Sequence, residues 1–103
     1  MNEISLFRCL GEPTRLSVLR QLAQGTEHSV SELVELTGQE RTNVSHHLAQ
    51  LRTCGLVRTR NQGKQVLYSL GHTALKDLLE LSAQVAEHIA AEDPEACVTE
   101  GCC

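Results

Sequence analysis

Apolar residues in the first part of the chain recur at helical spacing and are interrupted by glycines. A short apolar segment over residues 4–10 stops at Gly11, and Pro13 then opens a second helix that ends at Gly25. Proline is well tolerated at the first helical position, where its missing N–H costs nothing. The apolar positions of this second helix are Leu16, Leu19, Leu22 and Ala23. The pattern therefore predicts two helices, each burying one face.

Two further helices are predicted between Ser29 and Gly55. Ser29 and Glu32 have the spacing of a capping box, which starts a third helix that runs to Gly38. A fourth helix follows at once, with its apolar stripe at Val44, Leu48 and Leu51. Two helices joined by a short glycine-containing turn are the pattern of a helix-turn-helix.

After Leu56 the period of the pattern changes from helical to alternating. Residues 56–60 and 65–70 are strand-like, and Asn61-Gln62-Gly63-Lys64 joins them into a β-hairpin, or wing, with a basic tip. Residues 73–91 then have the pattern of a long helix. The predicted fold is mainly α with a small β-hairpin, a winged helix-turn-helix. Residues 1–92 are expected to form one domain, and residues 93–103 a flexible, cysteine-bearing, metal-binding tail.

Composition narrows the possible functions. The 103 residues hold 2% aromatics and no tryptophan, which argues against modules that stack bases on aromatic rings. No apolar run approaches the ~20 residues of a membrane span, and the N-terminus is not a signal peptide. We therefore expect a cytoplasmic protein that does not bind membranes. In that reducing compartment, five cysteines are better explained as metal ligands than as a disulfide framework.

The net charge of −4 is unevenly distributed. Residues 41–76 carry six basic and no acidic side chains, whereas residues 77–103 carry seven acidic and no basic ones. A polyanion would therefore bind the middle third, as expected of a nucleic-acid binder. This charge argues against a metal buffer or an interaction module that does not bind DNA. An enzyme is not expected, because no base is placed near a thiol in a recognisable pattern and no glycine-rich phosphate loop is present.

Three stretches of the sequence carry a family resemblance. They are LFRCLGEPTRL at 6–16, NVSHHL at 43–48 and LRTCGLV at 51–57, running into the wing. In this order and spacing they resemble the ArsR/SmtB family of winged-helix, metal-responsive repressors, over roughly residues 4–92. The resemblance implies a homodimer paired through the first and last helices. It also implies binding to double-stranded operator DNA, from which metal releases the protein.

In such a fold the helix from Arg41 to Cys54 enters the major groove and the wing contacts the backbone or the minor groove. The resemblance and the pattern together predict a set of DNA-contacting residues on the exposed side of this helix and on the wing. That set is Arg41, Thr42, Asn43, Ser45, His46, Arg58, Arg60 and Lys64. Adjacent His46 and His47 point about 100° apart on a helix and are not expected to chelate a metal.

Members of the family bind metals at different places, so the ligands are sought residue by residue. In the site on the last helix, His72 and His88 match two positions, but Ala74 and Val85 occupy the other two; both histidines are therefore expected at the surface. A cysteine pair found in other members before the reading helix is absent here. The candidate ligands that remain are cysteines, and their arrangement is similar to that of the cadmium- and lead-sensing CmtR-like branch.

In that branch the resemblance assigns Cys54 and Cys97 as ligands, the latter from the tail of the partner subunit. This chain departs from the branch at Gln50, where a further cysteine is usual, and Cys102 and Cys103 are the obvious replacements. Soft thiolates select soft ions, so the expected inducer is Cd(II) or Pb(II), with As(III) or Zn(II) as alternatives. Release would derepress metal resistance genes. Cys9 is expected to fill the core.

Two alternatives for the cysteines remain open at this point. Cys97, Cys102 and Cys103 could form a complete arsenite site within one tail, without Cys54. The cysteines could instead sense redox state, with a tail disulfide as the signal.

Overall fold

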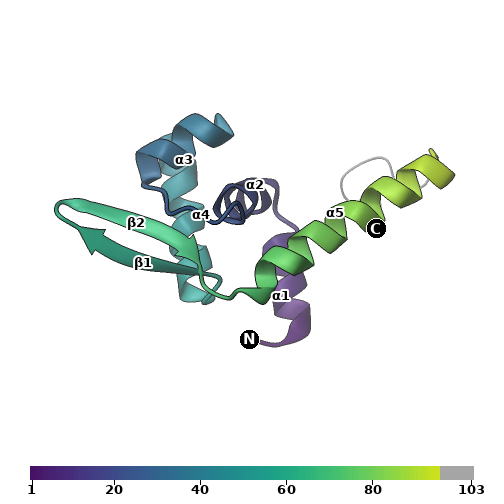
Figure 1. Ribbon diagram of the computed structural model, residues 1–103, viewed down its shortest axis with the longest axis horizontal. Coiled ribbons are helices and arrows are strands. Elements are labelled where there is room, and N and C mark those ends of the chain that lie inside the picture. The colour runs from purple at the N-terminus through teal and green to yellow at the C-terminus, as the bar shows by residue number, and fades with distance from the viewer. Residues whose placement is uncertain (96–103) are drawn as a thin grey trace.

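The computed structural model describes residues 1–95 as a winged helix-turn-helix, which confirms the predicted fold class. The helices are α1 (Glu3–Leu10), α2 (Pro13–Leu22), α3 (Val30–Thr37), α4 (Arg41–Thr53) and α5 (Ala74–Glu92), and the strands β1 (Val57–Gln62) and β2 (Gln65–Leu70) lie between α4 and α5. Figure 1 shows α2, α3 and α4 grouped together, the wing on one side of them, and α5 extending away on the other. The tail cysteines Cys97, Cys102 and Cys103 lie outside the described residues.

The helix boundaries follow from local capping. The Ser29 side chain accepts a hydrogen bond from the Glu32 N–H at 3.2 Å, and the Glu32 carboxylate accepts one from the Ser29 N–H at 3.1 Å. This is the predicted capping box, and it satisfies two otherwise unpaired donors at the start of α3. At the other end, Gly38 has a φ of 71°, a conformation that glycine adopts without steric cost and that ends the helix.

The core is aliphatic and lies where α2, α3 and α4 meet. Its fully buried side chains are Leu19, Leu22, Leu33, Leu48, Leu51, Val18 and Val44. The predicted apolar stripe of α4 is thus entirely buried, which leaves the opposite face of that helix exposed. Full burial of each such side chain contributes about 1.5–3 kcal/mol, so this packing sets the orientation of α4.

The wing is a tighter hairpin than the sequence predicts. We expected four connecting residues, but Asn61 pairs with Val66 and Gln62 pairs with Gln65, so only Gly63 and Lys64 form the turn. Gly63 has a φ of 61°, and positive φ allows a two-residue turn that matches the twist of the strands. The wing is also held at its base, where the N–H and C=O groups of His28 bond those of Tyr68 at 3.0 and 2.8 Å.

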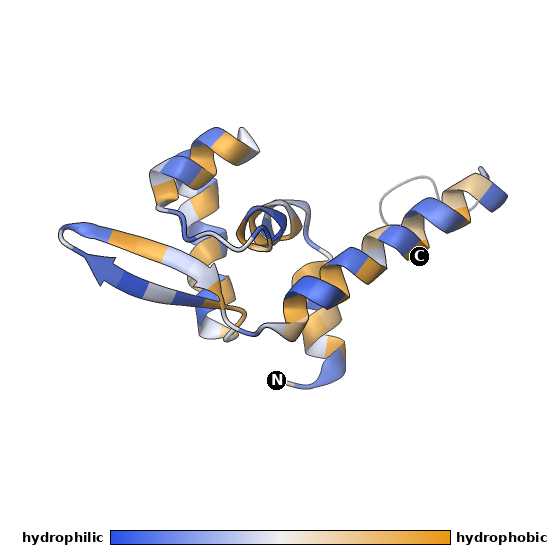
Figure 2. Ribbon diagram, in the orientation of Figure 1, coloured by the Kyte–Doolittle hydropathy of each residue, from blue (hydrophilic) through white to orange (hydrophobic). Residues whose placement is uncertain are grey.

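The last helix is only partly covered. Leu75 and Leu79 near its start are buried, whereas Leu81, Val85 and Ile89 are 58%, 57% and 48% exposed. Figure 2 shows that hydrophobic residues continue along α5 after it leaves the rest of the protein. None of the helices in residues 1–95 is long and apolar enough to cross a membrane.

Candidate nucleic-acid interface and thiol site

The exposed face of α4 carries four of the eight predicted DNA-contacting side chains. Arg41, Thr42, Ser45 and His46 are exposed, as expected from the burial of the opposite stripe. The Arg41 guanidinium donates a 2.6 Å hydrogen bond to the Ser31 hydroxyl, which links the first turn of α4 to α3. Arg41 is therefore held at the N-terminal end of α4, the end from which base edges are read in this class of fold.

Asn43 differs from the expectation that it lies on the exposed face. It is half-buried, and its amide donates hydrogen bonds to the Thr14 hydroxyl at 3.1 Å and the Gln39 side chain at 3.4 Å. The reason is the close packing of α2 on α4, which brings Thr14 within reach of residue 43. In this structure the Asn43 side chain joins the two helices rather than pointing to solvent.

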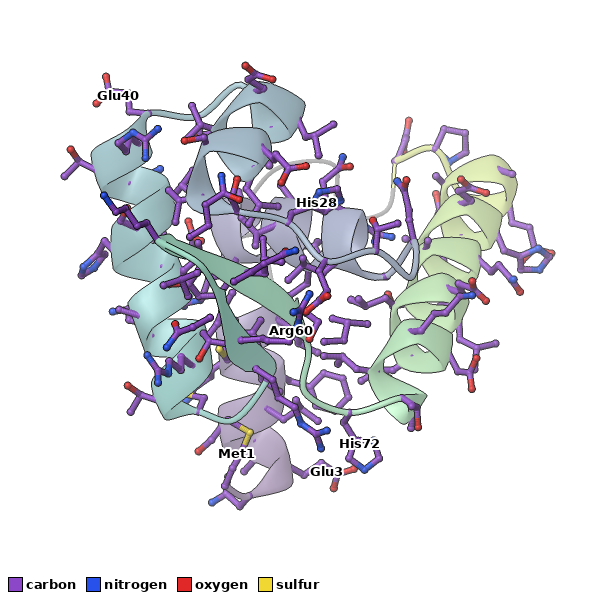
Figure 3. The ribbon with its side chains drawn as sticks, turned by 60° about the vertical axis from the view of Figure 1, so that its left-hand side comes forward. Met1, Glu3, His28, Glu40, Arg60 and His72 are labelled. Atoms are coloured by element: carbon purple, nitrogen blue, oxygen red, sulfur yellow. The ribbon has the colours of Figure 1, made fainter. Side chains whose placement is uncertain are left out.

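The wing presents three exposed cations, of which one is paired. Arg58 and Lys64 are exposed. Arg60 instead forms a bidentate ion pair with Glu27, with Nη2–Oε1 at 2.7 Å and Nε–Oε2 at 3.0 Å. This hydrogen bond from Arg60 lowers the pKa of the Glu27 carboxyl. Figure 3 shows Arg60 on the same side of the molecule as His28, beside the loop that precedes α3.

The junction between α2 and α4 contains a carboxylate that the sequence analysis did not single out. Glu12 caps α2 by accepting a 2.7 Å hydrogen bond from the Arg15 N–H, and His47 Nδ1 lies 3.6 Å from it. Burial raises the pKa of Glu12, but the N–H groups of Arg15 and Thr14 and the nearby His47 outweigh this, so the pKa is lowered. Glu12 therefore stays ionised at neutral pH, facing the reading helix.

Cys54 caps the C-terminal end of α4 and is exposed. One turn earlier, Gln50 accepts a 2.6 Å hydrogen bond from Arg15 Nη1. This position therefore holds an amide where a cysteine was expected from the family resemblance. Cys9 is buried, as expected of a core residue, but it also lines the same pocket as Cys54. The sequence contained no signal for this shared pocket, because the two cysteines lie on helices that are far apart along the chain.

The histidines do not assemble a site. His72 is exposed and its ring accepts a hydrogen bond from the Ala74 N–H, while His88 lies 3.0 Å from Glu92 on an exposed turn of α5. Both are surface residues, as predicted. Within residues 1–95, no three His, Cys, Asp or Glu side chains are grouped so as to hold a metal ion. Of the predicted ligands, only Cys54 lies in the described part of the chain.

Comparison with known proteins identifies the family to which this chain belongs. A model of the arsR family of bacterial regulatory proteins matches residues 12–59, and CmtR of Mycobacterium bovis is 38% identical over 95 residues, covering 92% of this chain and 78% of CmtR. The chain belongs to the arsR family. This confirms the resemblance deduced from the three sequence stretches, and it places the chain among transcriptional regulators rather than enzymes.

Two further regulators are similarly close. KmtR of Mycobacterium tuberculosis is 41% identical over 85 residues (82% of this chain, 65% of KmtR), and a probable mercury resistance operon repressor of Streptomyces lividans is 40% identical over 85 residues (82% and 67%). The chain thus spans about two thirds of the length of these two relatives. The solution structure of the homodimeric winged helix-turn-helix domain Mb0332 from Mycobacterium bovis has a TM-score of 0.71 and 33% identity, over 82% of this chain and 78% of that domain.

Proposed function

We propose that this arsR-family chain is a metal-responsive repressor. It binds operator DNA as a homodimer without metal, and it is released when a soft ion, Cd(II) or Pb(II), binds cysteine thiolates. The observation that carries the proposal is the position of Cys54. One helix, α4, presents exposed polar and basic side chains on its reading face and ends in an exposed thiol. A metal at that thiol would act directly on the element that reads DNA.

The charge of the reading surface supports binding to DNA. Residues 41–76 contain no acidic side chain, and Arg41 on α4 and Arg58 and Lys64 on the wing are exposed. Phosphate contacts from such cations supply most of the salt-dependent affinity of a DNA-binding protein. Base edges would be read by Arg41, with Thr42, Ser45 and His46 along the exposed side of α4. Arg60 would reach phosphate only by leaving Glu27, and Asn43 would have to leave Thr14 to reach a base.

The exposed apolar residues support a dimer. Leu81, Val85 and Ile89 recur every four residues along α5, and Ile4 and Phe7 on α1 are 65% and 54% exposed. Burying such a stripe against a second copy would remove apolar surface from water. Mb0332, which shares this fold, is described as homodimeric. A twofold dimer would place two copies of α4 on the two halves of a twofold-symmetric operator.

The donor chemistry supports a thiophilic inducer. Thiolates select soft ions, and Cd(II), Pb(II) and As(III) are satisfied by three sulfurs. Cys54 would supply one, and Cys97, Cys102 and Cys103, outside the described residues, would supply others. The relative from Streptomyces lividans is described as a probable mercury resistance operon repressor, in line with soft-metal sensing. Zn(II) is the alternative ion if four ligands are assembled.

The test is fluorescence anisotropy of the reduced protein on labelled DNA from upstream of its own gene. Cd(II), Pb(II), As(III) and Zn(II) are titrated separately at fixed salt, and we expect tight binding that is lost with Cd(II) or Pb(II). Cys54→Ser should abolish this release while leaving DNA affinity unchanged, whereas the matched control His88→Gln should behave like the unmodified protein. Unchanged release in Cys54→Ser would instead favour a tail-only site. Absence of DNA binding would contradict the proposal.

A further inference from the structure

A pocket of about 510 Å³ lies between α1, α2 and the second half of α4. Both described cysteines line it, Cys9 from the end of α1 and Cys54 from the end of α4. Cys9 is 7% exposed and Cys54 is exposed. An ion entering this pocket would therefore meet two thiols from two different helices.

The two thiols are neighbours in this pocket. Cys9 and Cys54 both line it, and neither cysteine is in a disulfide. One ion could bind both sulfurs from within this pocket, because a Zn–S bond is itself about 2.3 Å long and larger soft ions bind at longer distances. Cys9 lies in the last turn of α1 and Cys54 directly follows α4. Both helices pack on α2, so the backbone holds the two cysteines in place.

A positive side chain braces the pair. Arg15 Nε donates a 2.9 Å hydrogen bond to the carbonyl oxygen of Cys9, and Arg15 Nη1 donates a 2.6 Å hydrogen bond to Gln50. One guanidinium thus connects α1, α2 and α4 around the two sulfurs. Its charge favours the thiolate form that a metal requires.

We propose that Cys9 and Cys54 together form a two-thiolate site for a soft divalent cation, so that Cys9 supplies the sulfur that position 50 lacks. Two metal–sulfur bonds form, two thiol protons pass to solvent, and no oxidation takes place. The proposal rests on the proposed function, because the bound ion would be the inducer.

This site would join the two parts of the repressor that metal must connect. Cys54 ends the reading helix α4, and Cys9 lies on α1, which also carries the exposed Ile4 and Phe7 of the proposed dimer surface. An ion that binds both sulfurs would fix the end of α4 relative to α1. The differential binding energy of the ion can then shift the position of the reading helix.

The test uses the full-length, reduced protein under anaerobic conditions, with Cd(II) as the probe. Cd(II) is titrated against a competing chelator, and the ultraviolet absorbance of cadmium–thiolate bonds is followed. We expect Cys9→Ser to lower the Cd(II) affinity by at least about tenfold, since losing even a supporting group of a metal site costs that much. The absorbance per bound ion should fall as well. Affinity and absorbance equal to those of the unmodified protein would overturn the proposal.

A triple variant with serine at Cys97, Cys102 and Cys103 isolates the pair. It should still bind Cd(II) with two thiolates, and adding Cys9→Ser to it should abolish that absorbance. Circular dichroism melting of each variant shows whether it folds. As a measurement that needs no substitution, alkylation mapped by mass spectrometry should show Cd(II) protecting Cys9 and Cys54 together. Equal alkylation of Cys9 with and without Cd(II) would refute the site.

The two proposals fail in different ways. If Cd(II) binds Cys9 and Cys54 but leaves DNA binding unchanged, the metal-responsive repressor is refuted and the site stands. If Cys9→Ser is released from DNA at the same Cd(II) concentration as the unmodified protein, the pair is refuted and the repressor stands.

Discussion

The ion pair between Glu27 and Arg60 predicts that one cation of the wing can contact a DNA phosphate only after the pair is broken. Glu27 binds Arg60 in a bidentate manner at 2.7 and 3.0 Å, and both groups lie at the surface, with exposed side-chain fractions of 36% and 54%. An exposed pair of this kind contributes little to stability. Glu27→Ala should therefore leave the fold intact while freeing Arg60 to contact a phosphate.

The expected magnitude follows from counting charges. Each phosphate contact steepens the dependence of log K on log salt by about 0.9, and a dimer gains two contacts, so the slope should steepen by about 1.8. Between ~50 and ~200 mM salt, this slope corresponds to an additional loss of affinity of about tenfold. At the lowest salt the variant should bind more tightly than the unmodified protein.

The assay is anisotropy on labelled operator DNA at several salt concentrations. Glu35→Ala is the matched control, because it removes an exposed carboxylate of α3 without releasing Arg60. Adding Arg60→Ala to Glu27→Ala should return the slope to that of the unmodified protein. A slope for Glu27→Ala equal to that of Glu35→Ala would refute the reasoning.

Three further predictions concern the protomer and its assembly. In Gly71→Ala the new Cβ would collide with the Gly55 carbonyl oxygen. Because the backbone must move, we expect a loss of about 2–3 kcal/mol in the free energy of unfolding, measured by thermal unfolding, and an unchanged Tm would contradict this. Burial raises the pKa of Glu12, but its hydrogen bonds, chiefly that from the Arg15 N–H, outweigh this and lower the pKa. The ionised Glu12 cap therefore stabilises the fold above the ordinary carboxyl pKa, and this stabilisation is lost as the pH falls through the lowered pKa of the folded protein. Glu12→Gln should therefore cost about 1 kcal/mol at neutral pH and progressively less in acid, checked by denaturant unfolding at several pH values; a cost independent of pH would argue against the ionised cap. Val85→Glu, at a side chain that is 57% exposed in the protomer, should give a folded monomer with weakened DNA binding in analytical ultracentrifugation and anisotropy, and a persistent dimer would exclude this part of α5 from the interface.

The elements of this fold were predictable because their signals are local. The capping box of Ser29 and Glu32 and the stripe of Val44, Leu48 and Leu51 involve residues within two turns of one another, and the structure has both as expected. The hairpin was predictable for the same reason, although its exact register was not. The register depended on Gly63 adopting positive φ, which allows two residues to form the turn where four were expected.

The pairing of side chains across elements was decided only by the tertiary structure. The sequence alone predicted helices, a wing, a basic middle third and an arsR-family resemblance, since helical period, turn chemistry and charge are properties of short segments. It could not show that Cys9 and Cys54 line one pocket, that Arg15 bridges α1 and α4, or that Glu27 pairs with Arg60. Those arrangements depend on how α1, α4 and the wing pack around the buried leucines of the core. Packing of distant segments leaves no periodic trace in the chain, so the thiol pair became visible only when the helices were placed side by side.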